Sequence, residues 1–386
     1  MKALLFANTD WYLLNFRRGL LEALRESGVE VCLACPPGDY TGQLEDLGFR
    51  AVPLAFDRGS LGPVSNLRLL RDATRVVKRE QPDIVHNFTP KCVLSGGAAA
   101  RRHGVPCINA VTGLGHLFID DRPAIRAARR LARPVYRYAC GGPRCRVIFQ
   151  NSEDRDLFVS EKLVEESRTA LIRGSGADCG RFVPPEGPRR GGPCRLLFAS
   201  RLLKEKGIHE LLEAAGALRS RGVEFELTVA GDPDPGNPSS MTEEEIAAAT
   251  QTGLARFVGH SDDLLPLLQD ADLVVLPSYR EGTPKILLEA GACGKAMVAT
   301  EIAGCRGVVV PGVNGELVPP RDARALAAAL EKLVADPGLQ QEYGRGSREI
   351  VVREFSEEIV VNRTLEVYSA LLPGFRVPSR SASGAS

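Results

Sequence analysis

Residues 273–293 read LVVLPSYREGTPKILLEAGAC, and this stretch decides the fold class. The apolar run at its start predicts a buried strand over 273–277. Pro284 suits the first position of a helix, which we expect over 285–293. A second apolar strand follows over 296–299. A strand, a helix and a further strand in this order are typical of a parallel βαβ unit.

The same alternation runs through the rest of the chain and predicts an α/β protein with parallel sheets covered by helices on both faces. Further strands are expected over residues 3–7, 29–34, 84–87, 107–111, 147–150, 195–199, 225–230 and 255–258. Further helices are expected over residues 20–27, 67–80, 207–220, 321–335 and 357–372.

A stretch rich in proline, glycine and arginine over 183–193 interrupts this pattern and predicts a linker. At about 150 residues per domain, 386 residues also suggest two domains. We therefore expect two Rossmann-like domains that face each other across a cleft, since ligands bind at the carboxyl ends of parallel strands. The predicted parts are a first domain over 1–183, a linker over 184–193, a second domain over 194–355, a helix over 356–374 that packs back on the first domain, and a flexible tail over 375–386.

The composition excludes several classes of protein. Hydrophobic residues make up 44% and charged residues 25%, as in an ordinary globular protein. A net charge of +1 argues against a dedicated nucleic-acid binder. Ten cysteines are too few for a disulfide scaffold. Cys32 and Cys35 lie in the extended stretch 29–35, which points them to opposite faces. The apolar runs are too short for a membrane span or a signal peptide, so we expect a cytoplasmic protein.

Two glutamates bracket the start of the helix over 285–293. Glu281 precedes it and Glu289 lies inside it, with Gly282 and Thr283 in the turn between. The backbone N–H groups and dipole at a helix start attract anions. Glu289 can accept hydrogen bonds from a ribose, and Glu281 from the hydroxyls of a sugar. The alternative for this segment alone is an exposed helix with two solvated acids.

Two basic residues follow the strand over 195–199. Arg201 offers a planar fork and Lys206 a compact charge at the expected carboxyl end of the strand. Together they can neutralise a leaving diphosphate without a metal ion. The alternative is a solvated run of charges.

These residues resemble the retaining glycosyltransferase family 4, which has the GT-B fold. The spacing of Glu281 and Glu289 is similar to the pair of glutamates typical of that family, and Arg201 and Lys206 match its diphosphate-binding residues. Residues 289–295 and 312–319 also resemble the family, so the likeness covers most of 194–355. It implies a nucleotide-sugar donor bound mainly by the second domain, without a metal or other cofactor.

Two further motifs are not interpreted as ligand-binding sites. Asp232 and Asp234 have the spacing of a metal-binding pair, but prolines and glycines around them favour a simple loop. The glycines over 174–180 lack the spacing of a dinucleotide-binding motif.

The first half carries polar and aromatic residues after its expected strands. Residues 8–18 are expected to form a loop that opens on the cleft, and the alternative is that its aromatic residues pack against a helix. The predicted acceptor-binding residues are Asn8, Asp10, Trp11, Arg17 and Lys91. His116 follows a glycine-rich turn, and the family resemblance implies that it helps to position the donor sugar.

Residues 8–18, 89–97 and 112–118 resemble a branch of the family that extends sugars linked to polyprenyl diphosphate. This branch includes bacterial N-acetylgalactosaminyltransferases and capsule and O-antigen transferases. Asn15 and Phe16 depart from the polar pair of that branch, which leaves the acceptor open.

Residues 122–146 contain eight arginines and no acidic residue. A basic helix with tyrosines suits an anionic membrane surface, while a nucleic acid and a merely solvated face are the alternatives. The predicted membrane contacts are Arg122, Arg126, Arg129, Arg130, Arg133 and Arg137.

The resemblance and these residues together predict retaining transfer of a hexosyl or N-acetylhexosaminyl group from a UDP-sugar to a lipid-linked saccharide at the inner face of the membrane. Glu281, His116, Arg201 and Lys206 are the predicted catalytic residues, and Gly282, Thr283, Pro284 and Glu289 complete the donor site. The alternatives are a nucleotide-sugar epimerase with the same fold and a non-catalytic protein that binds lipid or sugar.

Overall fold

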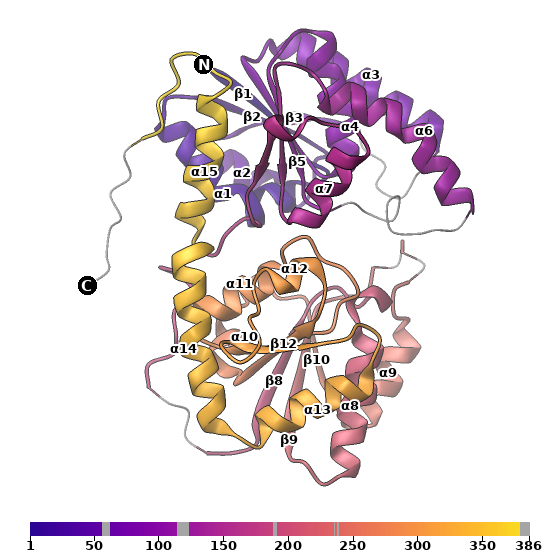
Figure 1. Cartoon of the computed structure of the whole chain (residues 1–386), viewed down its shortest axis with the longest axis vertical. Coiled ribbons are helices and arrows are strands. Elements are labelled where there is room, and N and C mark those ends of the chain that lie inside the picture. The colour runs from indigo at the N-terminus through magenta and orange to yellow at the C-terminus, as the bar shows by residue number, and fades with distance from the viewer. Residues whose placement is uncertain (56–61, 114–122, 188–190, 235, 238, 379–386) are drawn as a thin grey trace. The chain divides into compact units, whose positions relative to one another are not determined.

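The computed structural model describes residues 1–55, 62–113, 123–187, 191–234, 236–237 and 239–378 (Figure 1). The chain forms two compact units. The first comprises Met1–Ser175 and Glu358–Ser386, and the second comprises Gly176–Glu357.

The first unit contains a sheet of seven parallel strands in the order β3-β2-β1-β4-β5-β6-β7 (Figure 1). Its strands are β1 (Lys2–Phe6), β2 (Glu30–Cys35), β3 (Arg50–Pro53), β4 (Ile84–Phe88), β5 (Cys107–Val111), β6 (Cys145–Phe149) and β7 (Thr169–Leu171). Its α-helices are α1 (Asp10–Glu26), α2 (Thr41–Asp46), α3 (Pro63–Glu80), α4 (Pro90–Arg102), α6 (Pro123–Cys140), α7 (Ser152–Ser160) and α15 (Glu357–Ser369).

Helices cover both faces of this sheet, so its strands are largely buried and mostly apolar, with a few buried polar residues such as His86 and Asn109. In β1, Leu4 and Phe6 pack in the core under α3, α4 and α6, whereas Leu5 packs in the opposite core with α1 and α15. Cys32 and Cys35 likewise fall in these two different cores and are both free and buried, as their strand position predicts.

The second unit contains a sheet of six parallel strands in the order β10-β9-β8-β11-β12-β13. Its strands are β8 (Cys194–Ala199), β9 (Phe225–Ala230), β10 (Arg256–Gly259), β11 (Leu273–Leu276), β12 (Ala296–Thr300) and β13 (Gly315–Val318). Its α-helices are α8 (Ile208–Ser220), α9 (Glu243–Gln251), α10 (Leu265–Asp270), α11 (Lys285–Ala292), α12 (Ala303–Arg306), α13 (Ala323–Val334) and α14 (Pro337–Glu354). The predicted fold class, with two helix-covered parallel sheets, is confirmed.

The division between the units lies at Ser175, before the predicted end of the first domain at 183. The backbone explains the difference, because the N–H of Ala177 donates to the carbonyl of Phe355 at 2.9 Å. Arg348 also donates to the carbonyls of Cys179 and Phe182. These bonds tie the segment after Ser175 to α14. Residues 188–190 of the predicted linker and 379–386 of the predicted tail lie outside the described residues.

The prediction of a loop over residues 8–18 is wrong, because α1 begins at Asp10. Thr9 caps the helix by accepting a hydrogen bond from the backbone N–H of Tyr12 at 3.1 Å. The side chains of Tyr12 and Phe16, four residues apart, stack with their ring centres 5.2 Å apart. The aromatic residues thus belong to the helix, which is the alternative that the sequence left open.

Candidate active site

The polar loops of the second unit follow two neighbouring strands, β8 and β11. Lys206 lies in a short 3-10 helix after β8, and Glu281 lies in the turn after β11. The Nζ of Lys206 is 2.6 Å from Oε1 of Glu281, and both side chains are largely buried, at 18% and 13% exposed. The structure therefore joins two of the predicted catalytic residues, which are far apart in sequence, into one ion pair.

Gly207 allows this close approach of the two loops. Its φ is +74°, and a Cβ at this position would lie 2.1 Å from the carbonyl oxygen of Pro277. Only glycine combines that backbone conformation with so little space. The N–H of Tyr279 donates to the carbonyl of Glu205 at 2.8 Å and holds the same two loops together.

Arg201 does not join this ion pair but contacts a different acidic residue. Its Nη1 is 2.9 Å from Oδ2 of Asp234, and its side chain is largely exposed. Asp232 accepts a hydrogen bond from the backbone N–H of His260 at 2.9 Å. The two aspartates of the D-x-D motif thus make contacts that order their loop, in agreement with its interpretation as a loop.

Helix α11 begins directly after the turn that carries Glu281. The sequence predicts Pro284 at the first helical position, but the structure makes it the N-cap of α11. Its ψ of 116° is still that of extended backbone. A proline side chain cannot accept a hydrogen bond, so the first backbone N–H groups of the helix lack a side-chain cap at that position. Such a helix start suits an anionic group.

Glu289 lies one turn further along α11 and is only 6% exposed. Its Oε1 is 3.4 Å from Nζ of Lys285, one helical turn away. Burial raises the pKa of the Glu289 carboxyl, and the Lys285 ammonium opposes that rise. The carboxyl is therefore a poorly hydrated acceptor beside the helix start.

Several residues that order loops of the second unit have no role in the sequence-based prediction. The guanidinium of Arg321 lies 4.6 Å from the ring centre of Tyr279, whose hydroxyl donates to Glu210. Asn314 is buried and bonds to the backbone of Val308 and Val310 at 3.0 and 2.6 Å. A turn of the form Gly-x-Asn-Gly is the one sequence signal that pointed to Asn314.

Gly304 in α12 supports the turn that holds Glu281. A Cβ on Gly304 would lie 2.4 Å from the carbonyl oxygen of Gly282 and 2.6 Å from that of Glu281. The helix and the turn therefore touch backbone to backbone, and no side chain fits between them.

We expect Gly304→Ala to displace this turn. The free energy of unfolding should fall by about 1–3 kcal/mol, as for other overpacked sites, and the affinity for UDP should fall with it. Gly307→Ala is the matched control, since a Cβ there would meet its nearest atom at an ordinary 3.7 Å. Urea unfolding and calorimetric UDP titration measure both effects. Equal behaviour of the two variants would mean that the contact does not position the turn.

In the first unit, Asp10 is buried at the start of α1 and holds a loop rather than facing solvent. Its Oδ2 accepts hydrogen bonds from the N–H of Tyr40 at 3.0 Å and the hydroxyl of Thr41 at 2.9 Å. Its Oδ1 accepts from the N–H of Trp11. A Cβ on Gly38 would lie 2.8 Å from this carboxylate. Asp10 thus orders the loop over 38–41 beside the predicted acceptor residues.

The other predicted acceptor residues gather after β1 and β4, which are neighbours in the sheet. The Oδ1 of Asn8 is buried and has no hydrogen-bond partner among the described residues. Trp11 is partly exposed, and its ring packs edge-on against Phe16 at 5.3 Å. Lys91 lies in the first turn of α4, whose N-cap Thr89 has a φ of +71°, a conformation that is strained for a β-branched residue.

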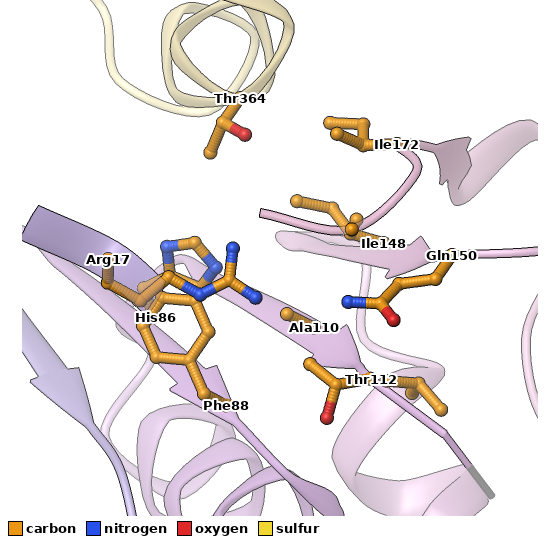
Figure 2. A pocket seen from close by; sticks show the side chains of 11 residues that line it. Arg17, His86, Phe88, Ala110, Thr112, Ile148, Gln150, Ile172 and Thr364 are labelled. Atoms are coloured by element: carbon orange, nitrogen blue, oxygen red, sulfur yellow. The ribbon is translucent and has the colours of Figure 1, made fainter. Parts of the chain in front are cut away.

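Arg17 lies deeper, in a small cavity with His86 and Phe88 (Figure 2). Its guanidinium carbon is 4.6 Å from the centre of the Phe88 ring. His86 is 1% exposed, and burial, with a smaller contribution from Arg17, lowers the pKa of its imidazole well below the usual value. His86 is therefore neutral near pH 7. The sequence-based prediction did not include His86 because a histidine inside an apolar strand gives no local signal of a site.

The predicted membrane contacts lie in and around α6. Arg126 and Arg130 are exposed, whereas Arg133 pairs with Glu161 and Arg137 donates to the carbonyl of Lys162 at 3.0 Å. Arg129 is half-buried. The predicted residues Arg122 and His116 lie outside the described residues.

Three apolar side chains of α6 face solvent beside these arginines. They are Leu131, Val135 and Tyr138, which are 78%, 41% and 44% exposed. Their spacing of four and three residues places them on one stripe of the helix. Of the helices in the described ranges, none combines the length and the hydropathy that a membrane crossing requires.

Comparison with known proteins covers both units. Residues 15–173 match the family described as a glycosyl transferase 4-like domain, and residues 183–350 match the family described as glycosyl transferases group 1. An N,N'-diacetylbacillosaminyl-diphospho-undecaprenol alpha-1,3-N-acetylgalactosaminyltransferase of Campylobacter jejuni is 27% identical over 93% of this chain and 96% of that protein. The capsular polysaccharide biosynthesis glycosyltransferase CapM of Staphylococcus aureus is 25% identical over 92% of this chain and 93% of that protein.

Solved structures with the same arrangement of strands and helices include sucrose-phosphate synthase from Thermosynechococcus elongatus, with a TM-score of 0.77 and 20% identity over 96% of this chain and 99% of that one. Anabaena HepE in complex with UDP-glucose has a TM-score of 0.75 and 20% identity over 96% of this chain and 100% of that one. At these identities the likeness concerns the fold.

Proposed function

The chain is a glycosyltransferase with the GT-B fold, built of a glycosyl transferase 4-like domain and a glycosyl transferases group 1 domain, and we propose that it is a retaining hexosyltransferase. The donor in this proposal is a UDP-sugar, and the acceptor is a saccharide linked to polyprenyl diphosphate, used in the assembly of a cell-surface glycan. The observation that carries the proposal is the Lys206–Glu281 pair beside the start of α11.

The donor assignment follows from the charges of the second unit. Lys206 and the start of α11 supply positive potential for a diphosphate, and Arg201 adds an exposed cation, paired with Asp234, at the end of β8. Gly282 and Thr283 form the turn against which a diphosphate would lie. Glu289 accepts the ribose hydroxyls, and Glu281 accepts hydroxyls of the sugar. The HepE complex with UDP-glucose is one reason to test uridine nucleotides first.

The proposed reaction exchanges one bond at the anomeric carbon. The bond from this carbon to the β-phosphate oxygen breaks, and its electron pair leaves with UDP. The acceptor hydroxyl forms the new bond on the same face, and its proton goes to the departing phosphate oxygen. Lys206 and Arg201 stabilise the negative charge that develops on the diphosphate, and Glu281 positions the sugar. The positioning role of His116, which lies outside the described residues, stays a prediction.

The lipid-linked acceptor is proposed from the relative in Campylobacter jejuni, which matches nearly the whole chain. The first unit would bind this acceptor through Asn8, Trp11, Arg17 and Lys91, with Asp10 holding the adjoining loop. The exposed stripe of α6 and its arginines would bring this unit to an anionic membrane surface.

A donor screen tests the proposal. The purified chain is incubated with UDP-, GDP-, ADP- and TDP-sugars, with and without a short polyprenyl-diphosphate saccharide, and nucleotide release and product mass are measured. UDP release that depends on the acceptor supports the proposal, and NMR of the product reads the anomeric configuration. Isomerised sugar without acceptor would instead identify an epimerase. Absence of binding to any nucleotide would contradict the donor site.

Metal independence is a further prediction, because Lys206, Arg201 and the helix start already supply positive charge to the diphosphate. We expect the rate of UDP release to stay within about twofold after exhaustive treatment with EDTA. Added Mg²⁺ or Mn²⁺ serves as the control. Loss of activity in EDTA, restored by one of these ions, would disprove the prediction.

Membrane binding predicts a strong effect of Leu131→Glu. The substitution replaces an exposed apolar side chain of α6 with a negative charge, which an anionic lipid surface repels. Binding to phosphatidylglycerol vesicles should therefore fall by about tenfold or more. Arg130→Gln should weaken binding by about 1 kcal/mol at low salt and less at high salt.

Val352→Glu on α14 is the control, since Val352 is also an exposed apolar residue of a helix. Vesicle sedimentation measures all three variants. Unchanged sedimentation of Leu131→Glu and Arg130→Gln would show that α6 is not the membrane-binding surface.

A further inference from the structure

Arg17 in α1 is a buried cation with an unusual set of partners. Its side chain is 8% exposed overall, and its Nε and one Nη donate to the hydroxyl of Tyr12 at 3.1 and 2.6 Å. The face of the Phe88 ring covers the guanidinium. No carboxylate among the described residues pairs with Arg17. Burial of a cation without a counter-ion costs free energy, and the Nη1 group of Arg17 makes no hydrogen bond to the described residues.

His86 presents a second donor to the same place. Its Nδ1 lies 3.0 Å from the hydroxyl of the fully buried Tyr368. Since Tyr368 has no other hydrogen-bond partner in the described part of the chain, its proton is satisfied only by donation to Nδ1. The imidazole proton then lies on Nε2. That atom is buried and has no partner among the described residues.

Both groups line one small cavity, together with Thr112, Gln150 and Thr364 (Figure 2). The cavity lies at the carboxyl ends of β4, β5 and β6, the edge of a parallel sheet where ligands bind. Its volume of about 10 Å³ is about the minimum that holds one water molecule. Thr112 and Gln150 are partly exposed, so the cavity opens on their side. It therefore admits a single oxygen atom and excludes a sugar ring.

We propose that this cavity binds one anionic oxygen of a phosphate or carboxylate group on the acceptor. The inference rests on the proposed function, because it assigns the group to the acceptor. The N–H groups of Arg17 and the Nε2–H of His86 are donors only, and charged oxygen acceptors make the strongest hydrogen bonds with such groups. The diphosphate of a lipid-linked acceptor and the carboxylate of an acidic sugar share this chemistry.

The test titrates the full chain, labelled with 15N-histidine and saturated with UDP, and reads the Nε2 resonance of His86 by NMR. His86→Gln assigns the resonance, and saturation with UDP keeps the probes out of the donor site. The probes are dimethylallyl diphosphate and methyl glucuronide. We expect a saturable shift with at least one probe, and the probe that binds identifies phosphate or carboxylate as the source.

Arg17→Met should weaken the binding of that probe by at least about tenfold, since it removes charge-assisted hydrogen bonds. Arg18→Met is the matched control, because Arg18 is an exposed neighbour that pairs with Glu22, and its affinity should equal that of the unaltered chain.

Absence of a shift with both probes at about 10 mM would overturn the inference and leave the cavity to a water molecule. Equal affinity of the Arg17→Met and Arg18→Met variants would overturn it as well. The titration of the unaltered chain decides the question even where a variant fails to fold. UDP binding in the same samples is a separate readout, so failure of the donor assignment is distinguishable from failure of this inference.

Discussion

Lys206→Met should lower kcat/KM for the sugar donor by about 10²- to 10³-fold, the range found when one preorganised group that stabilises transition-state charge is removed. The ammonium of Lys206 is largely buried and lies 2.6 Å from Glu281. In such surroundings its charge is screened less than in water, so it acts strongly on a leaving diphosphate. The measurement is steady-state release of UDP from the donor that the screen identifies, with the polyprenyl-diphosphate saccharide as acceptor.

Lys204→Met is the matched control, because Lys204 belongs to the same short 3-10 helix but is exposed. Its kcat/KM should stay close to that of the unaltered enzyme. The double variant Lys206→Met, Glu281→Gln separates two roles of the ion pair. We expect it to recover thermal stability, since no unpaired carboxylate remains, but not activity. Recovery of activity in the double variant would show that Lys206 acts only by holding Glu281.

Glu289→Gln should weaken UDP binding by about tenfold or more, because hydrogen bonds to an ionised carboxylate contribute roughly 1.5–3 kcal/mol. The same substitution should increase the free energy of unfolding at a pH where Glu289 is ionised. Burial raises the pKa of the Glu289 carboxyl in the folded chain above its value in the unfolded chain. The folded chain therefore binds this proton more tightly, and ionisation of Glu289 costs stability.

The pH dependence follows from that sign. At a pH below the unfolded-state pKa the carboxyl is protonated in both states, and the stability of the two proteins should differ least. As the pH rises through the raised pKa of the folded state, the unaltered chain loses stability and Glu289→Gln does not. The difference in Tm between variant and unaltered chain should therefore become more positive as the pH rises above the unfolded-state pKa of the carboxyl, and it should level off above the folded-state pKa.

Glu342→Gln is the control for this comparison, since Glu342 is an exposed residue of α14. Its Tm difference should not vary with pH, and its UDP affinity should be unchanged. Calorimetric titration with UDP and thermal denaturation across the pH range provide both readouts. A Glu289→Gln variant with normal UDP affinity would contradict the assignment of this carboxylate to the ribose.

The local structure around the predicted donor residues was more predictable from the sequence than that around the predicted acceptor residues. Glu281, Pro284 and Glu289 lie within nine residues of one strand–turn–helix unit, and Arg201 and Lys206 follow a recognisable strand. Turn and helix signals of this kind act over a few residues and are visible locally. The start of α1 was missed although Thr9 is a local capping residue, because the polar and aromatic residues after β1 were interpreted as a loop.

The sequence by itself determined the alternation of strands and helices, the parallel sheets and the spacing of the two glutamates, since each depends on periodicity or on local turn chemistry. Tertiary structure alone decided that Lys206 pairs with Glu281 across 75 residues, and that Tyr368 orients His86 across 282 residues. It also decided that Arg17 is buried rather than exposed. Such contacts form because neighbouring strands and a returning helix enclose them, and local sequence does not encode which distant side chain will lie beside a buried charge.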